Sequence, residues 1–220
     1  MPKVSIVTLC YNYGRYLDQC VASVMQQTFR DFEQIIVDPA STDNTPDIVA
    51  SWGRREWLRY LRLPMDPGIC SSKNAVIPYL DSEYLVFLDA DDKVHPQFLE
   101  KMVAVAGPKT LVCPGLQEFE NGSNAGWPTW GFSREDFIQN NRIFCCSMMP
   151  TLVFKSIGGY NSVLDRIGCE DWNLWIDLVT VGCSVKVVPE ILFYYRVHTG
   201  SHTQRFDTAD RHNFIRSLHS

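Results

Sequence analysis

Apolar residues in the first half of the chain alternate between short continuous runs and stretches with helical spacing. Short apolar runs are typical of strands buried on both faces of a sheet, and they occupy residues 4–9, 34–38, 58–63, 84–88 and 110–113. Helical spacing fills the segments between them, at residues 17–25, 45 onward, 71–80 and 96–105. Strands separated by helices of this length predict an α/β fold with a mostly parallel central sheet flanked by helices.

Individual residues sharpen the predicted helix boundaries in this half. Thr45 is placed to cap the second helix, Pro46 suits its first turn and Asp47 suits the positive end of its dipole. Pro78 interrupts the helix predicted over residues 71–80, because proline lacks a backbone donor. We therefore expect that helix to be weak.

The second half has a less regular pattern. Residues 118–131 are rich in Asn, Gly, Pro and Trp, which predicts a long functional loop. Helices are expected over 133–140, capped by Ser133, and over 170–181, with strands over 185–188 and 191–196 on either side of a Pro189–Glu190 turn. The tail, residues 203–220, is expected to form a short helix after one domain that spans residues 1–202.

Composition narrows the class of protein. The chain has 220 residues, 45% of them hydrophobic and 20% charged, which is ordinary for one globular domain. A net charge of -5 argues against nucleic acid as a partner. No apolar run approaches the ~20 residues of a transmembrane helix, and the N-terminus lacks a signal-peptide pattern. Most of the eight cysteines lie in or beside apolar segments, so we expect reduced thiols and a cytoplasmic protein.

Carboxylates follow two of the predicted strands. Asp38 ends the second strand, and the fourth runs directly into Asp89-Ala90-Asp91-Asp92. Ligands of parallel sheets bind beyond the carboxyl ends of the strands. Asp89 and Asp91 can share a turn and face one Mg²⁺ or Mn²⁺ ion, with diphosphate oxygens completing its shell. The alternative is an acidic turn that caps the helix beginning at Pro96.

Five segments, taken in order, resemble the successive motifs of family 2 glycosyltransferases with a GT-A fold: VSIVTLCYNYGRYLDQCVASVMQQTF, IIVDPASTDNT, YLVFLDADD, GCEDWNLWIDL and YYRVHTGS. The resemblance implies a metal-dependent, inverting, hexosyltransferase-like enzyme. Its donor would be a nucleoside-diphosphate sugar, with a UDP-sugar favoured. Its acceptor would be a hydroxyl group of a glycan or lipid-linked saccharide in cell-surface polysaccharide synthesis. Residues 1–113 would bind the nucleotide sugar, and residues 114–202 the acceptor.

The resemblance also assigns donor-site roles. Asp91 would be a direct metal ligand, and Asp89 would contact both the nucleoside and the metal. Asp38 would pair with the nucleotide base, while Thr8 and Tyr11 would line the nucleotide pocket; core packing is the alternative for Tyr11. The chain departs from the family directly after Asp38, where Pro-Ala replaces the usual acid and glycine. For residues 41–44, ordinary turn chemistry and ligand contact are both open.

Three basic residues match further family positions. Lys73 stands where an arginine usually reaches a phosphate or carboxylate, and its alternative is a solvated helix charge. His198 would supply a third contact to the metal or diphosphate, and a neutral imidazole suits Mn²⁺ better than Mg²⁺. Arg196 could instead bind the diphosphate. A surface position is the alternative for His198.

The acceptor side is marked by Glu170-Asp171, which matches the ED motif of the family. By this resemblance Asp171 is the catalytic base for the acceptor hydroxyl, and Glu170 orients the acceptor or Asp171 itself. The alternative is that both acids stabilise a helix N-terminus. Trp127 and Trp130 offer flat apolar surfaces for a sugar ring, with loop packing as their alternative.

Two other classes of function compete with a transferase. A catalytically silent GT-A-like protein would bind a nucleotide or glycan without turnover, and the departures at Pro39 and Lys73 favour it. A nucleotidyltransferase would need a glycine-rich basic loop after the first strand, and residues 10–14 do not form one. The tail could dock on its own domain, on a partner, or at a membrane surface as a peripheral contact; docking on its own domain is the default.

Overall fold

Four parallel strands form the first half of the central sheet. The structure is a computed structural model that describes residues 1–129, 131–199 and 208–219. The four strands stand in the order β3-β2-β1-β4. Their bounds are β1 (Val4–Leu9), β2 (Phe32–Asp38), β3 (Leu58–Arg62) and β4 (Tyr84–Phe87). The parallel α/β arrangement predicted from the apolar runs is confirmed for this half of the chain.

The helices of this half occupy the predicted segments, with corrections at their ends. They are α1 (Gly14–Met25), α2 (Thr45–Ser51), α3 (Ile69–Asn74), the 3-10 turn η1 (Ile77–Tyr79) and α4 (Phe98–Val105). Thr45 does not cap α2: it is the first helical residue, and Asp43 accepts hydrogen bonds from its backbone and hydroxyl instead. The helix expected over 71–80 ends at Asn74, and Pro78 lies in η1.

The second half completes a mixed sheet. The strand order continues β4-β8-β6-β9-β5, with β7 paired to β6. The strands are β5 (Lys93–Val94), β6 (Thr110–Glu120), β7 (Ala125–Gly126), β8 (Met148–Pro150) and β9 (Ser184–Val197). Strands β6 and β9 are parallel, whereas β8 is antiparallel to both β4 and β6. The helices are α5 (Arg134–Gln139), α6 (Thr151–Ser156), the 3-10 turn η2 (Ser162–Leu164), α7 (Glu170–Thr180) and α8 (Thr208–Leu218).

Two predictions for this half were wrong, and one was confirmed. The strands expected over 185–188 and 191–196 are one strand, β9, because a register irregularity at Gly115 of β6 absorbs Pro189 and Glu190. A Cβ on Gly115 would lie 2.5 Å from the Glu190 carbonyl oxygen, so this close approach requires glycine. The loop expected over 118–131 begins as the end of β6 and includes β7. Ser133 does cap α5, in a reciprocal capping box with Asp136.

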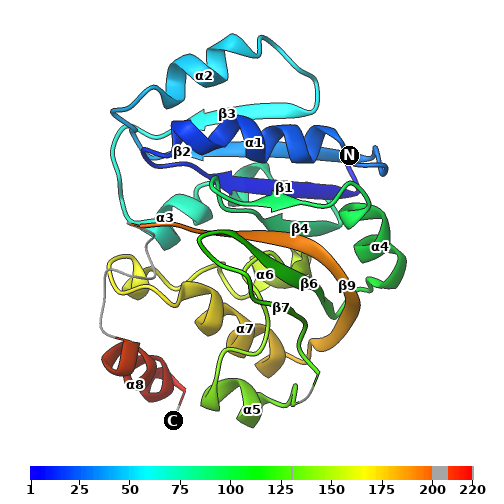
Figure 1. The fold of residues 1–220 in the computed structure, drawn as a ribbon. Helices are drawn as coiled ribbons and strands as arrows, with labels where there is room; N and C mark the ends of the chain where they lie inside the picture. Colours follow the sequence, from blue (N-terminus) through cyan, green and yellow to red (C-terminus); the bar gives the residue numbers. More distant parts are fainter. Residues whose placement is uncertain (130, 200–207, 220) are drawn as a thin grey trace.

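The sheet buries apolar side chains on both faces. Val7 of β1 belongs to the core packed around α7, and the adjacent Ile6 belongs to the core packed around α4. In Figure 1 the long strand β9 curves past α7 toward the N-terminal half, and α8 lies at the edge beside α7. Ile215 of α8 is fully buried. In the described part of the chain, no helix combines the length and apolarity that a membrane crossing requires.

The turn after β2 carries a backbone conformation that is unfavourable for its residue. Ala40 has a φ of 60°, in the left-handed region, and its N–H donates to the Asp38 carbonyl at 2.9 Å. This conformation costs an L-residue with a Cβ roughly 1–2 kcal/mol. A glycine at this position would adopt it without that cost.

We predict that Ala40→Gly stabilises the protein. The relieved strain outweighs the extra entropy of glycine in the unfolded chain, which costs about 0.4–1 kcal/mol, so the free energy of unfolding should rise by roughly 0.5–1 kcal/mol. Urea unfolding followed by circular dichroism measures this change. The matched control is Ala22→Gly in the middle of α1, which should lower stability by about 1 kcal/mol. A loss of stability in both variants would contradict the argument.

Candidate active site

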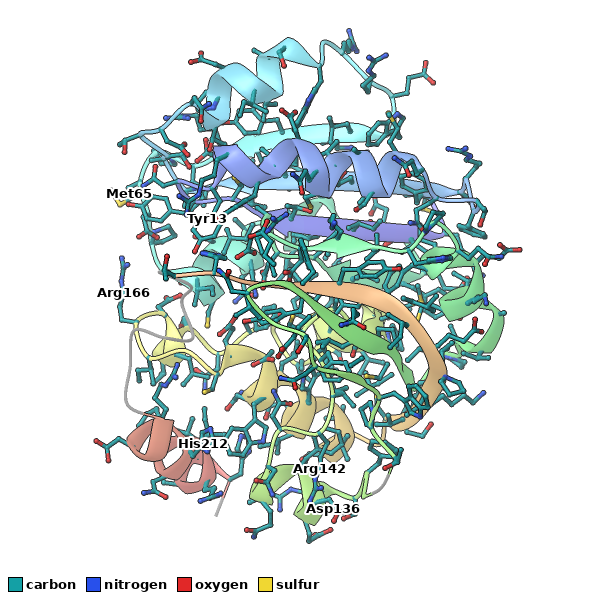
Figure 2. The ribbon with its side chains drawn as sticks, in the orientation of Figure 1. Tyr13, Met65, Asp136, Arg142, Arg166 and His212 are labelled. Carbon is teal, nitrogen blue, oxygen red and sulfur yellow. The ribbon has the colours of Figure 1, made fainter. Side chains whose placement is uncertain are left out.

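A cavity of about 970 Å³ opens at the carboxyl ends of the parallel strands. Tyr11 and Tyr13 line it after β1, Pro39 after β2, and Asp89 and Asp91 after β4. Tyr13 and Arg166, labelled in Figure 2, lie along the same edge of the molecule, and both line this cavity. The candidate site is thus at the sheet edge that the sequence predicted.

The turn after β4 presents two of its carboxylates to this cavity and directs the third inward. Asp89 and Asp91 are partly exposed, whereas Asp92 is 1% exposed and accepts a hydrogen bond from the Arg196 backbone N–H at 2.8 Å. The Nε2 atom of His198 lies 3.0 Å from Oδ2 of Asp91. Of the predicted metal-binding residues, Asp91 and His198 are therefore in contact, and Asp89 lines the same cavity as Asp91. The surface alternative for His198 is wrong because this side chain is buried.

The charges of this turn suit a divalent cation. Burial, together with the charge of Asp89, raises the pKa of Asp91 above its usual range. The same two causes, burial first and then the charges of Asp91 and Asp89, raise that of Asp92. Carboxylates that disfavour one another's ionisation would be relieved by a cation between them. Mn²⁺ accepts carboxylate oxygens and an imidazole nitrogen as ligands.

A second set of possible metal ligands lies at the same turn, and we did not predict it from the sequence. One oxygen each of Asp89 and Asp92 and the thiol of Cys145 lie within 4.8 Å of one another. Within the described residues, Oδ2 of Asp92 is buried without a hydrogen-bond partner. Burial, reinforced by neighbouring carboxylates, raises the pKa of Cys145 well above its usual value, so its sulfur is a protonated thiol. Such a sulfur is a poor ligand for Mg²⁺ or Mn²⁺.

The residues expected at the nucleotide base occupy two different environments. Asp38 is fully buried and accepts hydrogen bonds from the Ser41 backbone N–H at 2.6 Å, from Arg62 at 2.8 Å and from the Tyr60 hydroxyl. Thr8 is likewise buried, and its hydroxyl accepts a hydrogen bond from Gln34 at 2.9 Å. Pro39, rather than Asp38, faces the cavity.

Tyr11 shows the opposite behaviour, because its side chain is 43% exposed at the cavity. This exposure makes the alternative of core packing wrong. An aromatic ring at the end of β1 is therefore available to stack on a flat ligand such as a base.

Arg196 holds the turn after β4 in place. Its guanidinium lies between the rings of Tyr16 and Phe119, at 4.6 and 4.4 Å from their centroids. Its Nε donates to the Asp91 carbonyl at 2.6 Å, and its terminal nitrogens bind Gln19 and Glu120. Arg196 is 2% exposed. In this structure the guanidinium nitrogens of Arg196 bind protein groups. A contact with a diphosphate stays a prediction, because it would require these hydrogen bonds to rearrange.

Glu170 and Asp171 begin α7, as predicted, and each has partners there. Asp171 accepts hydrogen bonds from the Trp172 backbone N–H at 2.7 Å and from Asn141 at 3.2 Å. Burial, and then the charge of Glu170, raise its pKa to about 6. Stabilisation of the helix N-terminus explains the hydrogen bond to Trp172. It does not explain the raised pKa of Asp171, which suits a general base.

Lys73 lies between the two acidic motifs. It is 1% exposed, which makes the alternative of a solvated helix charge wrong. Its Nζ lies 3.0 Å from Oε1 of Glu170 and 3.7 Å from Oδ1 of Asp89. Trp127 is 44% exposed, so loop packing does not bury it, and Trp130 lies outside the described residues.

Solved structures share this fold. The chain aligns with the structure of Staphylococcus aureus TarS residues 1–349 in complex with UDP-GlcNAc at a TM-score of 0.80 and 17% identity, covering 97% of this chain and 64% of that one. The complex of the same protein with UDP aligns at a TM-score of 0.75 and 19% identity, over 89% and 60% of the two chains. The fold of this chain is the GT-A fold.

Curated relatives include two synthases of Pasteurella multocida. Chondroitin synthase of strain Pm70 is 29% identical over 98% of this chain, and hyaluronan synthase is 29% identical over 92%. The chain spans 23% of the length of the first and 21% of the second. The model of the family Glycosyl transferase family 2 matches residues 5–159, which is more than half of the chain. The chain therefore belongs to glycosyl transferase family 2.

Proposed function

We propose that this chain transfers a sugar, with inversion, from a nucleoside-diphosphate sugar to a hydroxyl group of a glycan or lipid-linked saccharide. The observation that carries the proposal is the placement of Asp89 and Asp91 in a cavity at the strand ends, with His198 bound to Asp91 and with Glu170 linked to Asp89 through Lys73. The relatives named as chondroitin and hyaluronan synthases support an acceptor in polysaccharide synthesis.

A UDP-sugar is the favoured donor. The structural neighbour TarS was solved in complex with UDP and with UDP-GlcNAc. Its likeness to this chain shows the fold, and the choice of UDP for this chain is part of our proposal. In this chain the cavity offers the exposed ring of Tyr11 for stacking, and Pro39 stands at the place where the base would be read. Asp38 would reach a base only by giving up one of its three protein partners.

Asp89, Asp91 and His198 are the residues that would hold Mn²⁺ or Mg²⁺. A bound cation would neutralise the charge that develops on the leaving diphosphate, an effect worth several kcal/mol. The protein's own part is to fix these ligands. Arg196 donates from its side chain to the Asp91 carbonyl and from its backbone N–H to the Asp92 carboxylate, so this one residue holds the turn by two hydrogen bonds.

Asp171 is the proposed base for the acceptor hydroxyl. Inverting transfer requires a base on the face of the sugar opposite the leaving group, and the first turn of α7 supplies one beside the donor half. With a pKa of about 6, this carboxylate is a stronger base than an ordinary aspartate and is still ionised at neutral pH. Glu170 would position it from the adjacent residue.

We expect UDP to bind in a Mn²⁺-dependent manner, and Asp91→Ala to abolish that dependence. The reason is that Asp91 is the carboxylate paired with His198 at the cavity. Calorimetric titration with UDP, GDP, CDP and dTDP, with and without Mn²⁺, measures both the binding and the choice of base. Asp210→Ala on α8 is the matched control and should bind like the wild type. Failure of the wild type to bind any of the four nucleotides would contradict the proposed donor site.

Replacing the proposed base should separate binding from transfer. Asp171→Asn keeps the size of the side chain but cannot accept a proton, so we expect kcat to fall by roughly 10²–10⁴-fold while UDP binding stays unchanged. In the wild type, the pKa of about 6 predicts that kcat falls as the pH drops below about 6, because the protonated carboxyl is inactive. Release of UDP during turnover measures both effects.

Two outcomes would decide against this assignment. Near-normal turnover by Asp171→Asn would remove Asp171 from the role of base. Tight nucleotide binding by the wild type without release of UDP from any tested UDP-sugar, with saccharide acceptors present, would favour the nucleotide-binding protein without catalysis. The pH profile is recorded at saturating Mn²⁺ so that protonation of the Asp91 region does not obscure it.

The Cys145→Ser variant distinguishes the two possible sets of metal ligands at the turn after β4. If Asp89, Asp91 and His198 hold the cation, we expect this variant to retain the wild-type Kd for Mn²⁺ within about 3-fold, because the oxygen ligands that hard cations prefer are untouched. His198→Ala should weaken Mn²⁺ binding by about 10-fold or more. Titration of Mn²⁺ by electron paramagnetic resonance measures both constants. The reverse pattern would assign the cation to Asp89, Asp92 and Cys145.

A further inference from the structure

Lys73 is a buried cation that contacts carboxylates from both halves of the chain. It lies in the last turn of α3, and its Nζ is 3.0 Å from Glu170 and 3.7 Å from Asp89. The rings of Phe87 and Tyr160 lie beside the ammonium, with centroids at 5.8 and 5.2 Å. A lysine this deeply buried is stable as a cation only when it is paired.

The charges around Lys73 fix its protonation state. Burial alone would lower the pKa of this lysine, but the charges of Glu170 and Asp89 outweigh burial and hold the pKa well above its usual value. The other titratable groups that interact with its charge are Tyr160, Asp171 and Cys70.

The neighbouring residue ties the same helix to the segment that precedes α7. The side-chain amide of Asn74 donates to the Tyr160 carbonyl at 2.8 Å and accepts from the Tyr160 N–H at 2.8 Å. A Cβ on Gly159 would lie 2.4 Å from the Asn74 side chain, so the contact depends on glycine. Helix α3 is thus fixed to the polypeptide that leads into α7.

The position of Lys73 does not favour a donor ligand. Its side chain is 1% exposed, and it is absent from the described lining of the cavity, whereas its neighbour Ser72 is part of that lining. Glu170, its nearer partner, is followed directly by Asp171 in the first turn of α7. Whatever fixes Glu170 therefore also fixes the helix turn that presents the proposed base.

We propose that Lys73 is a positioning residue for transfer: by binding Asp89 and Glu170 together, it sets the placement of the acceptor-side base relative to the donor-side carboxylate. This inference rests on the proposed function. Transfer requires the reacting groups to be aligned, and a misplacement of about 1 Å can cost roughly 100-fold in rate. Lys73 would act through Glu170, without touching the substrate.

The test is a set of variants measured for both binding and turnover. We expect Lys73→Met to lower kcat by about 100-fold, while the Kd for UDP with Mn²⁺ and the KM for the donor change by less than about 3-fold. Lys73→Arg should recover most of the lost kcat because it restores the positive charge. Lys155→Met is the matched control: this lysine donates to the Leu80 carbonyl at 2.7 Å, away from the cavity, and its replacement should leave kcat unchanged.

A double-mutant cycle with Glu170→Gln tests whether Lys73 acts through Glu170. If it does, the double variant loses no more kcat than Lys73→Met alone, since the two residues form one unit. Multiplicative losses would overturn the inference. So would a 10-fold rise in the Kd for UDP with kcat retained, which would make Lys73 a donor ligand. If Lys73→Met fails to fold by circular dichroism, the cycle is run with Lys73→Gln. Absence of UDP binding and turnover in the wild type would instead contradict the proposed function itself.

Discussion

The burial of charge around the turn after β4 is the constraint on which the rest of this structure depends. Three carboxylates, Asp89, Asp91 and Asp92, follow one buried strand within four residues, and two buried cations from distant segments bind the turn. Removing one partner of a buried ion pair costs about 3–5 kcal/mol. Arg196 and Lys73 therefore do more than balance charge: they join β9 and α3 to the site that the turn forms.

The features predictable from the sequence are those set by local pattern. The parallel strands of the first half are continuous apolar runs, and the helices between them have a clear periodicity. Both were found within a few residues of their observed bounds, except that the helix expected over 71–80 ends at Asn74. The candidate site followed from the same pattern, because carboxylates at strand ends converge whatever the details of the fold. Asp91 and His198, more than a hundred residues apart, could be joined only through the family resemblance.

The features that were missed depend on contacts between distant segments. Strand β8 is three residues long and gains its partners from β4 and β6, so no local periodicity marks it. Strand β9 passes through Pro189 only because Gly115 of β6 allows the chains to approach closely. Cys145 reaches Asp89 and Asp92 through folding alone. From the sequence, we predicted that Arg196 and Lys73 bind the donor. The sequence does not show that each side chain is buried and bound to polar groups of the protein itself.

These contacts also join the two halves of the chain at the candidate site. Strand β9 belongs to the second half, yet its end delivers Arg196 to the turn of the first half, and His198 follows directly after it. Lys93 and Val94, just after that turn, pair with β9 in return. A change in the second half that shifted β9 would therefore move Asp91 and His198, the proposed cation ligands, whereas the exposed Trp127 can vary without such an effect. If residues 114–202 bind the acceptor as proposed, diversity of acceptors is compatible with a fixed donor site when variation is confined to segments that do not contact β9.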